Sequence, residues 1–195
     1  MHYFFPLIGY LIGSVSAAIL VCKAAGLPDP RSEGSGNPGA TNVLRFGGKV
    51  PAALTLLGDA AKGLVPVLAA SALGVPPLWV GLTAVAAVVG HMFPLFFQFR
   101  GGKGIATSFG AIFGISWLAG LLVITSWLAI SLTFRYSSLA ALTSMAILPL
   151  YLWITTRSVE LVVCGAVIGV LIFWRHRTNI ARLLAGSEPK IGDKK

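Results

Sequence analysis

Three short clusters of glycine, amide and cationic residues interrupt a largely apolar chain, and their side chains are suited to holding anions. The clusters span residues 35–45, 100–104 and 175–182. Arginine and lysine bind phosphate directly, and glycine lets backbone N–H groups approach an anion closely. Because each cluster lies at the end of a long apolar run, the sequence predicts a phosphate-binding site at a membrane surface.

The first cluster is the richest in polar groups and reads Ser-Gly-Asn-Pro-Gly-Ala-Thr-Asn-Val-Leu-Arg. An ordinary interhelical turn needs glycine and proline but not this density of amides and hydroxyls. We interpret the segment as a phosphate-binding loop in which Arg45 supplies a planar guanidinium, and in which Thr41 is also placed to cap a short helix. The residues expected to contribute backbone or neutral side-chain donors are Ser35, Gly36, Asn37, Gly39, Thr41 and Asn42.

The second cluster, Arg-Gly-Gly-Lys-Gly, invites comparison with the phosphate loop of nucleotide-binding proteins but does not match it. Phe97 stands where that motif has its first glycine, and Gly104 follows the lysine where the motif has Ser or Thr. A glycine nest around Lys103 remains, made by Gly102 and Gly104, and Thr107 lies in the first turn of the next predicted helix, whose N-terminus favours anions. The alternative is that the cations of this cluster bind no phosphate and reflect only the excess of positive charge in cytoplasmic loops.

The third cluster, Arg-His-Arg-Thr-Asn, follows the last apolar run. Its arginines, Arg177 among them, are typical of a juxtamembrane anchor for anionic lipid head groups. That reading does not explain His176 and Asn179, which are three positions apart and therefore share one face of a helix. We predict that this pair belongs to the site and that Arg177 adds a phosphate contact.

Four further polar side chains lie within or beside the apolar runs. Asp59 and Lys62 are three positions apart in one run, so they can pair and avoid the cost of isolated charges in a membrane. They either orient the site or take part in the reaction. His91 is either a general base or a helix–helix hydrogen-bonding group. Ser138 either donates to phosphate or caps a helix.

The composition identifies the class of protein that must position these residues. Of 195 residues, 56% are hydrophobic and 11% are charged, and the mean hydropathy is +0.84. A soluble domain of this size cannot bury so much apolar surface, so we predict a single all-α integral membrane domain over residues 1–195. The formal net charge of +9 would suggest nucleic acid in a soluble protein. Membrane topology and phosphorylated substrates explain it here, and no nucleic-acid partner is expected.

Charge parity predicts the number of membrane passes. Cations follow the first, third and last apolar runs, and the positive-inside rule places all three groups in the cytoplasm. This requires two passes within residues 105–134, with a turn between Gly114 and Gly120 and about 15 residues in each half. The prediction is seven transmembrane helices, some short, with the N-terminus outside; the alternative has six. The apolar runs are approximately 3–22, 51–74, 77–98, 105–134, 137–155 and 159–174.

Several kinds of chemistry find no support in the sequence. The six acidic residues form no cluster with His or Cys that would bind a metal, and no nucleophile motif is present. We therefore expect no metal or cofactor, and catalysis that depends on gripping anions and orienting reactants. The polar tail from about residue 187 is expected to be mobile.

The motifs together resemble one known family. The first cluster, Gly-Asp-x-x-Lys-Gly, Gly-His-x-Phe-Pro, Gly-Gly-Lys-Gly-x-Ala-Thr and His-Arg-x-Asn-Ile are similar, in order and over the whole chain, to the bacterial acyl-phosphate:glycerol-3-phosphate acyltransferase (PlsY) family. The resemblance implies seven transmembrane helices in the cytoplasmic membrane and a site facing the cytoplasm. It also implies transfer of a fatty acyl group from acyl phosphate to the 1-hydroxyl of glycerol 3-phosphate. The products are lysophosphatidic acid and phosphate, in the first acylation of phospholipid synthesis.

The resemblance also assigns residues and partners. Five positions match substrate-binding or catalytic positions of the family: Ser35, Arg45, Lys103, His176 and Asn179. Ser138 corresponds to a serine whose register varies, and Ala141 departs from the family pattern. The implied partners are acyl phosphate, glycerol 3-phosphate, membrane lipids and, functionally, the enzyme that forms acyl phosphate. No cofactor is implied.

The residues leave the details of the mechanism open. One set, the first loop with Lys103, would hold one phosphate, and Arg45 with His176 and Asn179 would hold the other; the two roles are interchangeable at this stage. The hydroxyl would attack the activated carbonyl directly, and its proton would go to the departing phosphate or to His91. Two other classes of protein are alternatives: a transporter of phosphorylated metabolites, and a noncatalytic protein that binds anionic lipid.

Overall fold

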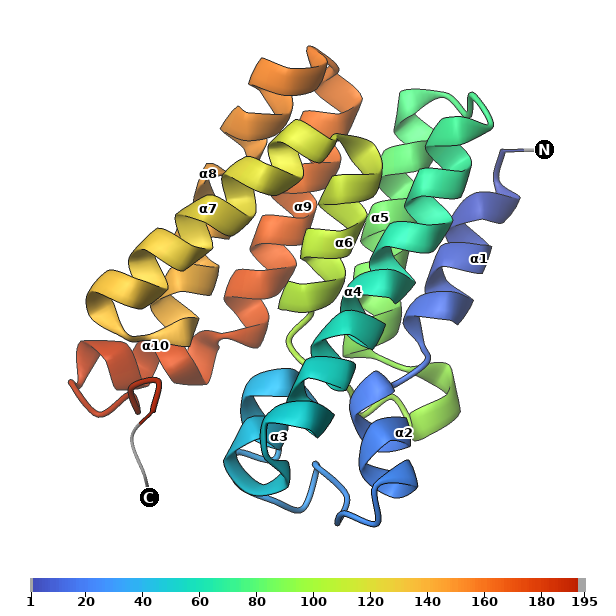
Figure 1. Cartoon of the computed structure of the whole chain (residues 1–195). Coiled ribbons are helices and arrows are strands. Elements are labelled where there is room, and N and C mark those ends of the chain that lie inside the picture. The colour runs from blue at the N-terminus through green and yellow to red at the C-terminus, as the bar shows by residue number, and fades with distance from the viewer. Residues whose placement is uncertain (1, 193–195) are drawn as a thin grey trace.

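The structure is a computed structural model that describes residues 2–192, and within that range it contains helices and turns but no strand (Figure 1). Each long apolar run of the sequence forms one helix or a pair of helices. The elements are α1 (Phe4–Gly13), α2 (Ala17–Ala24), α3 (Ala40–Gly47), α4 (Lys49–Ala72), α5 (Pro77–Met92), the 3-10 turn η1 (Leu95–Phe97), α6 (Ile105–Ile115), α7 (Trp117–Phe134), α8 (Ser137–Thr156), α9 (Val159–Arg175) and α10 (Arg177–Leu184).

The first apolar run, expected to be one helix, is broken between α1 and α2. A break frees backbone carbonyls that a continuous helix would satisfy, and such groups are costly in a membrane. Lys62 Nζ, from the middle of α4, donates to the Val15 carbonyl at 2.7 Å. Lys62, which the sequence predicted to pair with Asp59, thus stabilises the break.

Residues 105–134 form two helices, as the charge-parity argument from the sequence predicted. Ser116 is extended, with φ of −153°, and separates α6 from α7 within the predicted interval. The division is uneven, with 11 residues in α6 and 18 in α7 instead of about 15 in each. Figure 1 shows α6 leaving the end of the bundle that carries α3 and α10, and α7 returning from the opposite end.

The number of complete crossings stays a prediction. Among the described residues, five segments are long and apolar enough to span a membrane, or six if α9 and α10, bent by 63°, count as one. The 11 residues of α6 extend only about 16 Å, roughly half of the hydrocarbon thickness. A Cβ on Gly63 of α4 would collide with the Thr107 carbonyl of α6, so glycine lets these helices pack closely.

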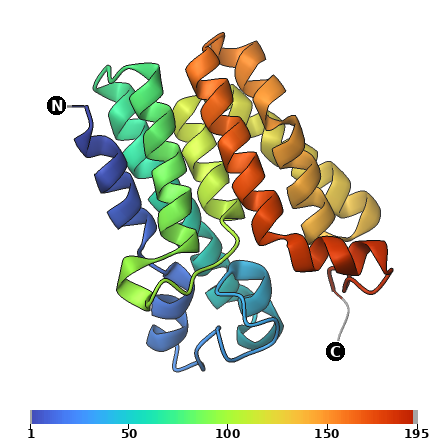
Figure 2. The same cartoon turned by 180° about the vertical axis from the view of Figure 1, so that it is seen from behind.

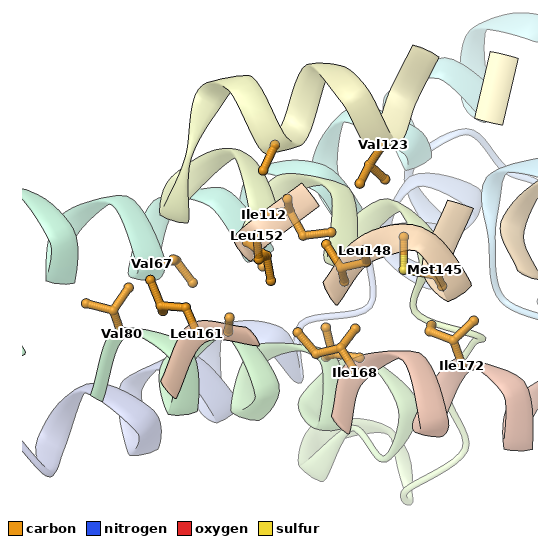
Figure 3. Close-up of a cluster of buried hydrophobic side chains, with 14 of the residues drawn as sticks. Val67, Val80, Ile112, Val123, Met145, Leu148, Leu152, Leu161, Ile168 and Ile172 are labelled. Carbon is orange, nitrogen blue, oxygen red and sulfur yellow. The ribbon is translucent and has the colours of Figure 1, made fainter. Parts of the chain in front are cut away.

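The apolar core fixes the helix ends that carry the polar loops. Figure 3 shows buried side chains from α4, α5, α6, α8 and α9 meeting in one cluster, including Val67, Ile112, Leu148 and Ile168. In both views α3, the connection from α5 to α6, and α10 lie at the same end of the bundle, and the start of α1 lies at the other (Figures 1 and 2). The three polar clusters therefore share one end of the molecule.

Candidate active site

The first loop is held in shape by Asn42. This side chain is only 2% exposed, and its Oδ1 accepts a hydrogen bond from the Ser35 N–H at 2.8 Å. Its Nδ2 donates to the carbonyls of Pro30 and Glu33, both at 2.9 Å. Asn42 was expected to contact phosphate, but its amide is used inside the loop. Gly34 has a φ of +56° and faces Asn42 Oδ1 so closely that a Cβ would collide with it.

Two glycine N–H groups of the first loop are used in the loop's own turns. The N–H of Gly36 donates to the Glu33 carbonyl and that of Gly39 donates to the Asn37 carbonyl, both at 2.9 Å. These two N–H groups, expected to bind an anion, are therefore engaged within the chain. The Asn37 side chain is half-buried beside Gly39.

The predicted short helix is present as α3, and its cationic side chain is open to solvent. Gly39 is the N-cap and no side chain caps the helix, so the prediction that Thr41 caps it is wrong. Ser35, Thr41 and Arg45 are all exposed. The loop thus presents a hydroxyl and a guanidinium at the polar end of the molecule.

The second loop is clamped from two sides. The Gly102 N–H donates to the His91 carbonyl at 3.2 Å. Arg175 donates to the Gly101 carbonyl at 2.7 Å through Nη2, and to the Gly102 carbonyl at 3.1 and 2.9 Å through Nε and Nη2. The last residue of α9 therefore fixes a loop more than 70 positions earlier in the chain.

Arg177, expected to bind phosphate, is turned away from this loop. It is exposed, its guanidinium lies 5.1 Å from the centre of the Trp174 ring, and its Nη1 donates to the Trp174 carbonyl at 3.3 Å. The bend between α9 and α10 falls between Arg175 and Arg177, and it gives the two arginines different surroundings.

A chain of hydrogen bonds joins the second cluster to the third. Lys103 Nζ donates to Asn179 Oδ1 at 2.5 Å, and Asn179 Nδ2 donates to Glu188 Oε1 at 2.6 Å. Glu188 Oε1 also accepts from Ser138 Oγ, and its Oε2 accepts from Arg182 Nε, each at 2.7 Å. Ser138 thus contacts a carboxylate of the chain itself in this structure.

The described part of the tail differs from the mobile segment that we expected. Besides Glu188, Ile191 N donates to the Arg135 carbonyl at 2.6 Å, and Arg135 Nη2 donates back to the Ile191 carbonyl at 2.9 Å. The Lys190 ammonium lies 5.6 Å from the centre of the Tyr136 ring. These contacts hold residues 188–191 against the start of α8. Residues 193–195, also included in that expectation, lie outside the described residues.

The charges in this network influence one another. Burial lowers the pKa of Lys103 to about 8; the charge of Glu188 opposes this shift, and the charges of Arg182, Arg175 and Arg45 add to it. Burial alone would raise the pKa of Glu188, but hydrogen bonds from Ser138, Asn179 and Arg182 outweigh it and hold that pKa below its usual value. Glu188 is therefore ionised at neutral pH and helps Lys103 to keep its proton.

His176 lies at the bend between α9 and α10 and is only 3% exposed. Its Nδ1 lies 2.8 Å from the Ile172 carbonyl oxygen. Because a carbonyl can only accept, Nδ1 carries a proton, and in the neutral imidazole Nε2 is then an acceptor. Asn179 is also buried, one turn further along α10.

A buried ion pair supports the second loop from inside the bundle. Asp59 and Lys62 pair at 2.8 Å, as their spacing predicted, and His91 Nδ1 lies 3.5 Å from the same Asp59 oxygen. A Cβ on Gly102 would collide with His91 Nε2, so the imidazole lies directly beneath the loop. This position favours the supporting role for His91 over that of a general base.

Two residues at the start of α6 have packing roles. Gly104 has a φ of +86° and is the N-cap of α6, and a Cβ there would press on Met92 and Val88. Thr107 is fully buried against α4 at Gly63. Its hydroxyl has no hydrogen-bond partner among the described residues, and its predicted phosphate contact stays a prediction.

The three clusters meet at one place. A Cβ on Gly102 would lie 3.0 Å from the Pro38 carbonyl oxygen, so the first and second loops touch. Lys103 binds Asn179, and the charge of Arg45 acts on Lys103. No group of three or more His, Cys, Asp or Glu side chains placed to hold a metal occurs among the described residues. The assembled chemistry is therefore cationic and amide-rich, and it is suited to binding anions.

Comparison with known proteins agrees with this arrangement. The family model for glycerol-3-phosphate acyltransferase matches residues 3–186. The chain belongs to the PlsY family of glycerol-3-phosphate acyltransferases. Among its relatives, the glycerol-3-phosphate acyltransferase of Thioalkalivibrio sulfidiphilus is 57% identical over 185 residues, which are 95% of this chain and 91% of the relative. That of Methylococcus capsulatus is 50% identical over 186 residues, which are 95% of this chain and 94% of the relative.

Solved structures of the PlsY family share the whole fold. The glycerol 3-phosphate form of PlsY, an integral membrane glycerol 3-phosphate acyltransferase, superposes with a TM-score of 0.92 at 41% identity, covering 98% of this chain and 96% of that chain. The lysophosphatidic acid form gives a TM-score of 0.90 at 40% identity, covering 98% and 95%. The all-α membrane fold predicted from the sequence is therefore confirmed.

Two residues that shape this PlsY-family site were missed by sequence reasoning. Arg175 was interpreted only as one of the third cluster's arginines, typical of a lipid anchor, and Glu188 only as part of a polar tail. The available signal for Glu188 was its position: it is one of only six acidic residues, and it follows the Arg-rich third cluster. A carboxylate at this position can pair with the arginines of the third cluster, and this pairing can hold the segment that carries it against the bundle.

Proposed function

We propose that this chain transfers a fatty acyl group from acyl phosphate to the 1-hydroxyl of glycerol 3-phosphate. The observation that carries the proposal is the meeting of Lys103, Asn179 and Arg45 at one polar end of a membrane bundle. Family membership supports the acceptor, because the relatives are named for glycerol 3-phosphate. The acyl-phosphate donor rests on the motifs and on the anion-binding character of the site.

In this proposal the cations hold the acceptor while its hydroxyl attacks. Arg45, exposed at the rim, and Lys103, bound to Asn179, would grip the phosphate of glycerol 3-phosphate together with the Ser35 hydroxyl. The buried imidazole of His176 offers Nε2 as an acceptor toward the glycerol hydroxyls. Holding the acceptor in this way, with its hydroxyl toward the donor, supplies most of the rate acceleration, since acyl phosphate is already activated.

The chemical step balances without an acyl-enzyme. The 1-hydroxyl oxygen forms a bond to the acyl carbonyl carbon, and the bond from that carbon to the phosphate oxygen breaks. Phosphate leaves with the electron pair and takes up the hydroxyl proton. Because the phosphate takes up this proton, the step does not need His91 as a base. His91 is instead buried beneath Gly102 beside Asp59. N–H groups of the loops that are not already engaged would stabilise the negative charge on the carbonyl oxygen.

The test is phosphate release by purified protein given palmitoyl phosphate, with and without glycerol 3-phosphate and without added metal. We expect release that depends on the acceptor and is matched by lysophosphatidic acid. A folded, monodisperse sample that releases no phosphate across several chain lengths would overturn the proposal. Uptake of glycerol phosphate into proteoliposomes without acyl transfer would indicate the transporter instead.

The proposed orientation in the cytoplasmic membrane places the polar end inside and the start of α1 outside. Cations gather at the polar end, in agreement with the positive-inside rule. Cysteine labelling from outside intact cells should modify Trp117→Cys, an exposed residue at the start of α7, and spare Thr41→Cys. The reverse pattern would overturn the orientation.

A further inference from the structure

A groove runs between α5 and α9 at the end of the bundle opposite the polar clusters, and the proposed acyl transfer makes no use of it. Its volume is about 410 Å³. The starts of both helices lie at the end away from α3 and α10 (Figures 1 and 2). A Cβ on Gly81 of α5 would collide with the thiol of Cys164, which lines the groove, so the two helices touch there.

The walls of the groove are two stripes of aliphatic side chains. On α9 the stripe is Val159, Val163 and Val167, each four positions from the next and therefore on one face of the helix. All three valines are exposed. The opposite wall comes from α5 and consists of Leu78, Leu82 and Val85. A hollow between two such stripes on a membrane protein is suited to a hydrocarbon chain.

The length of the groove matches one leaflet of a bilayer. From Val159 to Val167 the helix rises about 12 Å, and the hydrocarbon of one leaflet is about 15 Å deep. Near the polar end of the same two helices, the rings of Phe93 and Trp174 meet with their centres 5.9 Å apart. A chain in the groove therefore enters from the opposite surface, and it belongs to a lipid of that leaflet instead of a donor held at the polar end.

The mouth of the groove carries charges of both signs. Glu160 lines it and is exposed; its Oε2 accepts a hydrogen bond from Ser158 Oγ at 2.7 Å, and it has no cationic partner within residues 2–192. Arg157, three positions earlier, is also exposed and lies 5.6 Å from the centre of the Trp153 ring instead of pairing with Glu160. A carboxylate and a guanidinium at a membrane surface complement a head group that holds an ammonium and a phosphate.

We propose that the groove between α5 and α9 binds a phospholipid whose head group carries a primary ammonium. The ammonium donates to Glu160, the phosphate faces Arg157, and one acyl chain lies between the two helices. A primary ammonium offers three donors, whereas the quaternary ammonium of phosphatidylcholine offers none and the head group of phosphatidylglycerol has no positive charge. Phosphatidylethanolamine is therefore the fitting ligand. In the proposed orientation it comes from the outer leaflet, and its binding does not depend on the proposed function.

Native mass spectrometry of the full chain in detergent tests this assignment, with phosphatidylethanolamine and phosphatidylglycerol of identical acyl chains added in turn. We expect one phosphatidylethanolamine to be retained per chain, with a Kd roughly tenfold below that for phosphatidylglycerol. Glu160→Gln should remove this preference. Glu33→Gln, which removes the same charge at the polar end, is the matched control and should keep it.

A second variant tests the chain-binding part of the groove. Val163→Trp fills the groove from an exposed position and leaves both head-group charges in place, so it should weaken retention of both lipids while acyl transfer stays unchanged. Equal retention of the two lipids by the wild type, or the same preference in Glu160→Gln, would overturn the head-group assignment. Displacement of the bound lipid by palmitoyl phosphate would assign the groove to the acyl donor and overturn the proposal. A second copy of the chain retained in place of the lipid would overturn it as well.

Discussion

The first loop and the junction of the second and third clusters are stabilised in opposite ways. Asn42 braces the first loop through partners 7 to 12 positions away, and the loop leaves Ser35 and Arg45 exposed. The Lys103–Asn179 bond joins residues 76 positions apart, and Asn179 is in turn bonded to Glu188. The first loop is therefore a local structure that presents free side chains, whereas the junction exists only when the whole bundle is folded.

The largest expected effect concerns the junction. Lys103→Ala removes the one lysine in the second loop and should lower kcat/KM for glycerol 3-phosphate roughly 100- to 1000-fold, because a cation held in a partly buried site acts strongly on an anion. Lys49→Ala, at the exposed start of α4, is the matched control and should keep near-normal activity. Both are measured at equal amounts of monodisperse protein. Near-normal turnover by Lys103→Ala would remove the junction from the mechanism.

The first loop should be destabilised by loss of the Asn42 side chain that holds it in shape. Asn42→Ala breaks three hydrogen bonds and leaves the Ser35 N–H and two carbonyls without their partner, so we expect a loss of about 2–4 kcal/mol in the free energy of unfolding. The neighbouring Thr41→Ala, exposed and not a cap, should change it by less than about 0.5 kcal/mol. Thermal unfolding in detergent compares the two. Equal effects would mean that Asn42 does not hold the loop.

The charge coupling within the junction gives a pH prediction. Lys103 binds phosphate in its protonated form, and its pKa is about 8, so kcat/KM for glycerol 3-phosphate should fall as the pH rises through 8. The second ionisation of a phosphate monoester lies near pH 6, so the substrate stays a dianion over this range.

Glu188→Gln sharpens that test. Loss of the carboxylate charge removes the influence that raises the pKa of Lys103, so the midpoint of the pH profile should move to lower pH. Rates are corrected for spontaneous hydrolysis of acyl phosphate at each pH. A purely structural role for Glu188 would lower activity at every pH and leave the midpoint in place.

The contrast between the two regions also explains what the sequence could predict. Helix spans follow from apolar runs, and the division near Ser116 follows from charge parity, because both signals are local or additive along the chain. The docking of Glu188 depends on Ser138, Asn179 and Arg182, which come from two different helices. No local pattern contains that information.

The break between α1 and α2 was missed for a similar reason. Residues 14–16 carry no proline or glycine, so nothing in that stretch indicates a break. The lysine that satisfies the freed carbonyl of Val15 lies 47 positions later, in α4. The same limit applies to Asn42, whose residue type predicted an anion contact, whereas its side chain bonds the Ser35 N–H and two carbonyls 9 and 12 positions earlier in the chain.

The smallest expected effect separates the two arginines that flank His176. Arg177→Gln removes an exposed charge that stacks on Trp174, and it should change kcat/KM by less than about threefold, since exposed charges contribute little. Arg175→Gln removes three hydrogen bonds to the Gly101 and Gly102 carbonyls and should cost far more. Both variants lose the same charge two positions apart in the chain, so equal losses would mean that charge alone matters. A loss confined to Arg175→Gln would show that the site depends on the clamp across the chain.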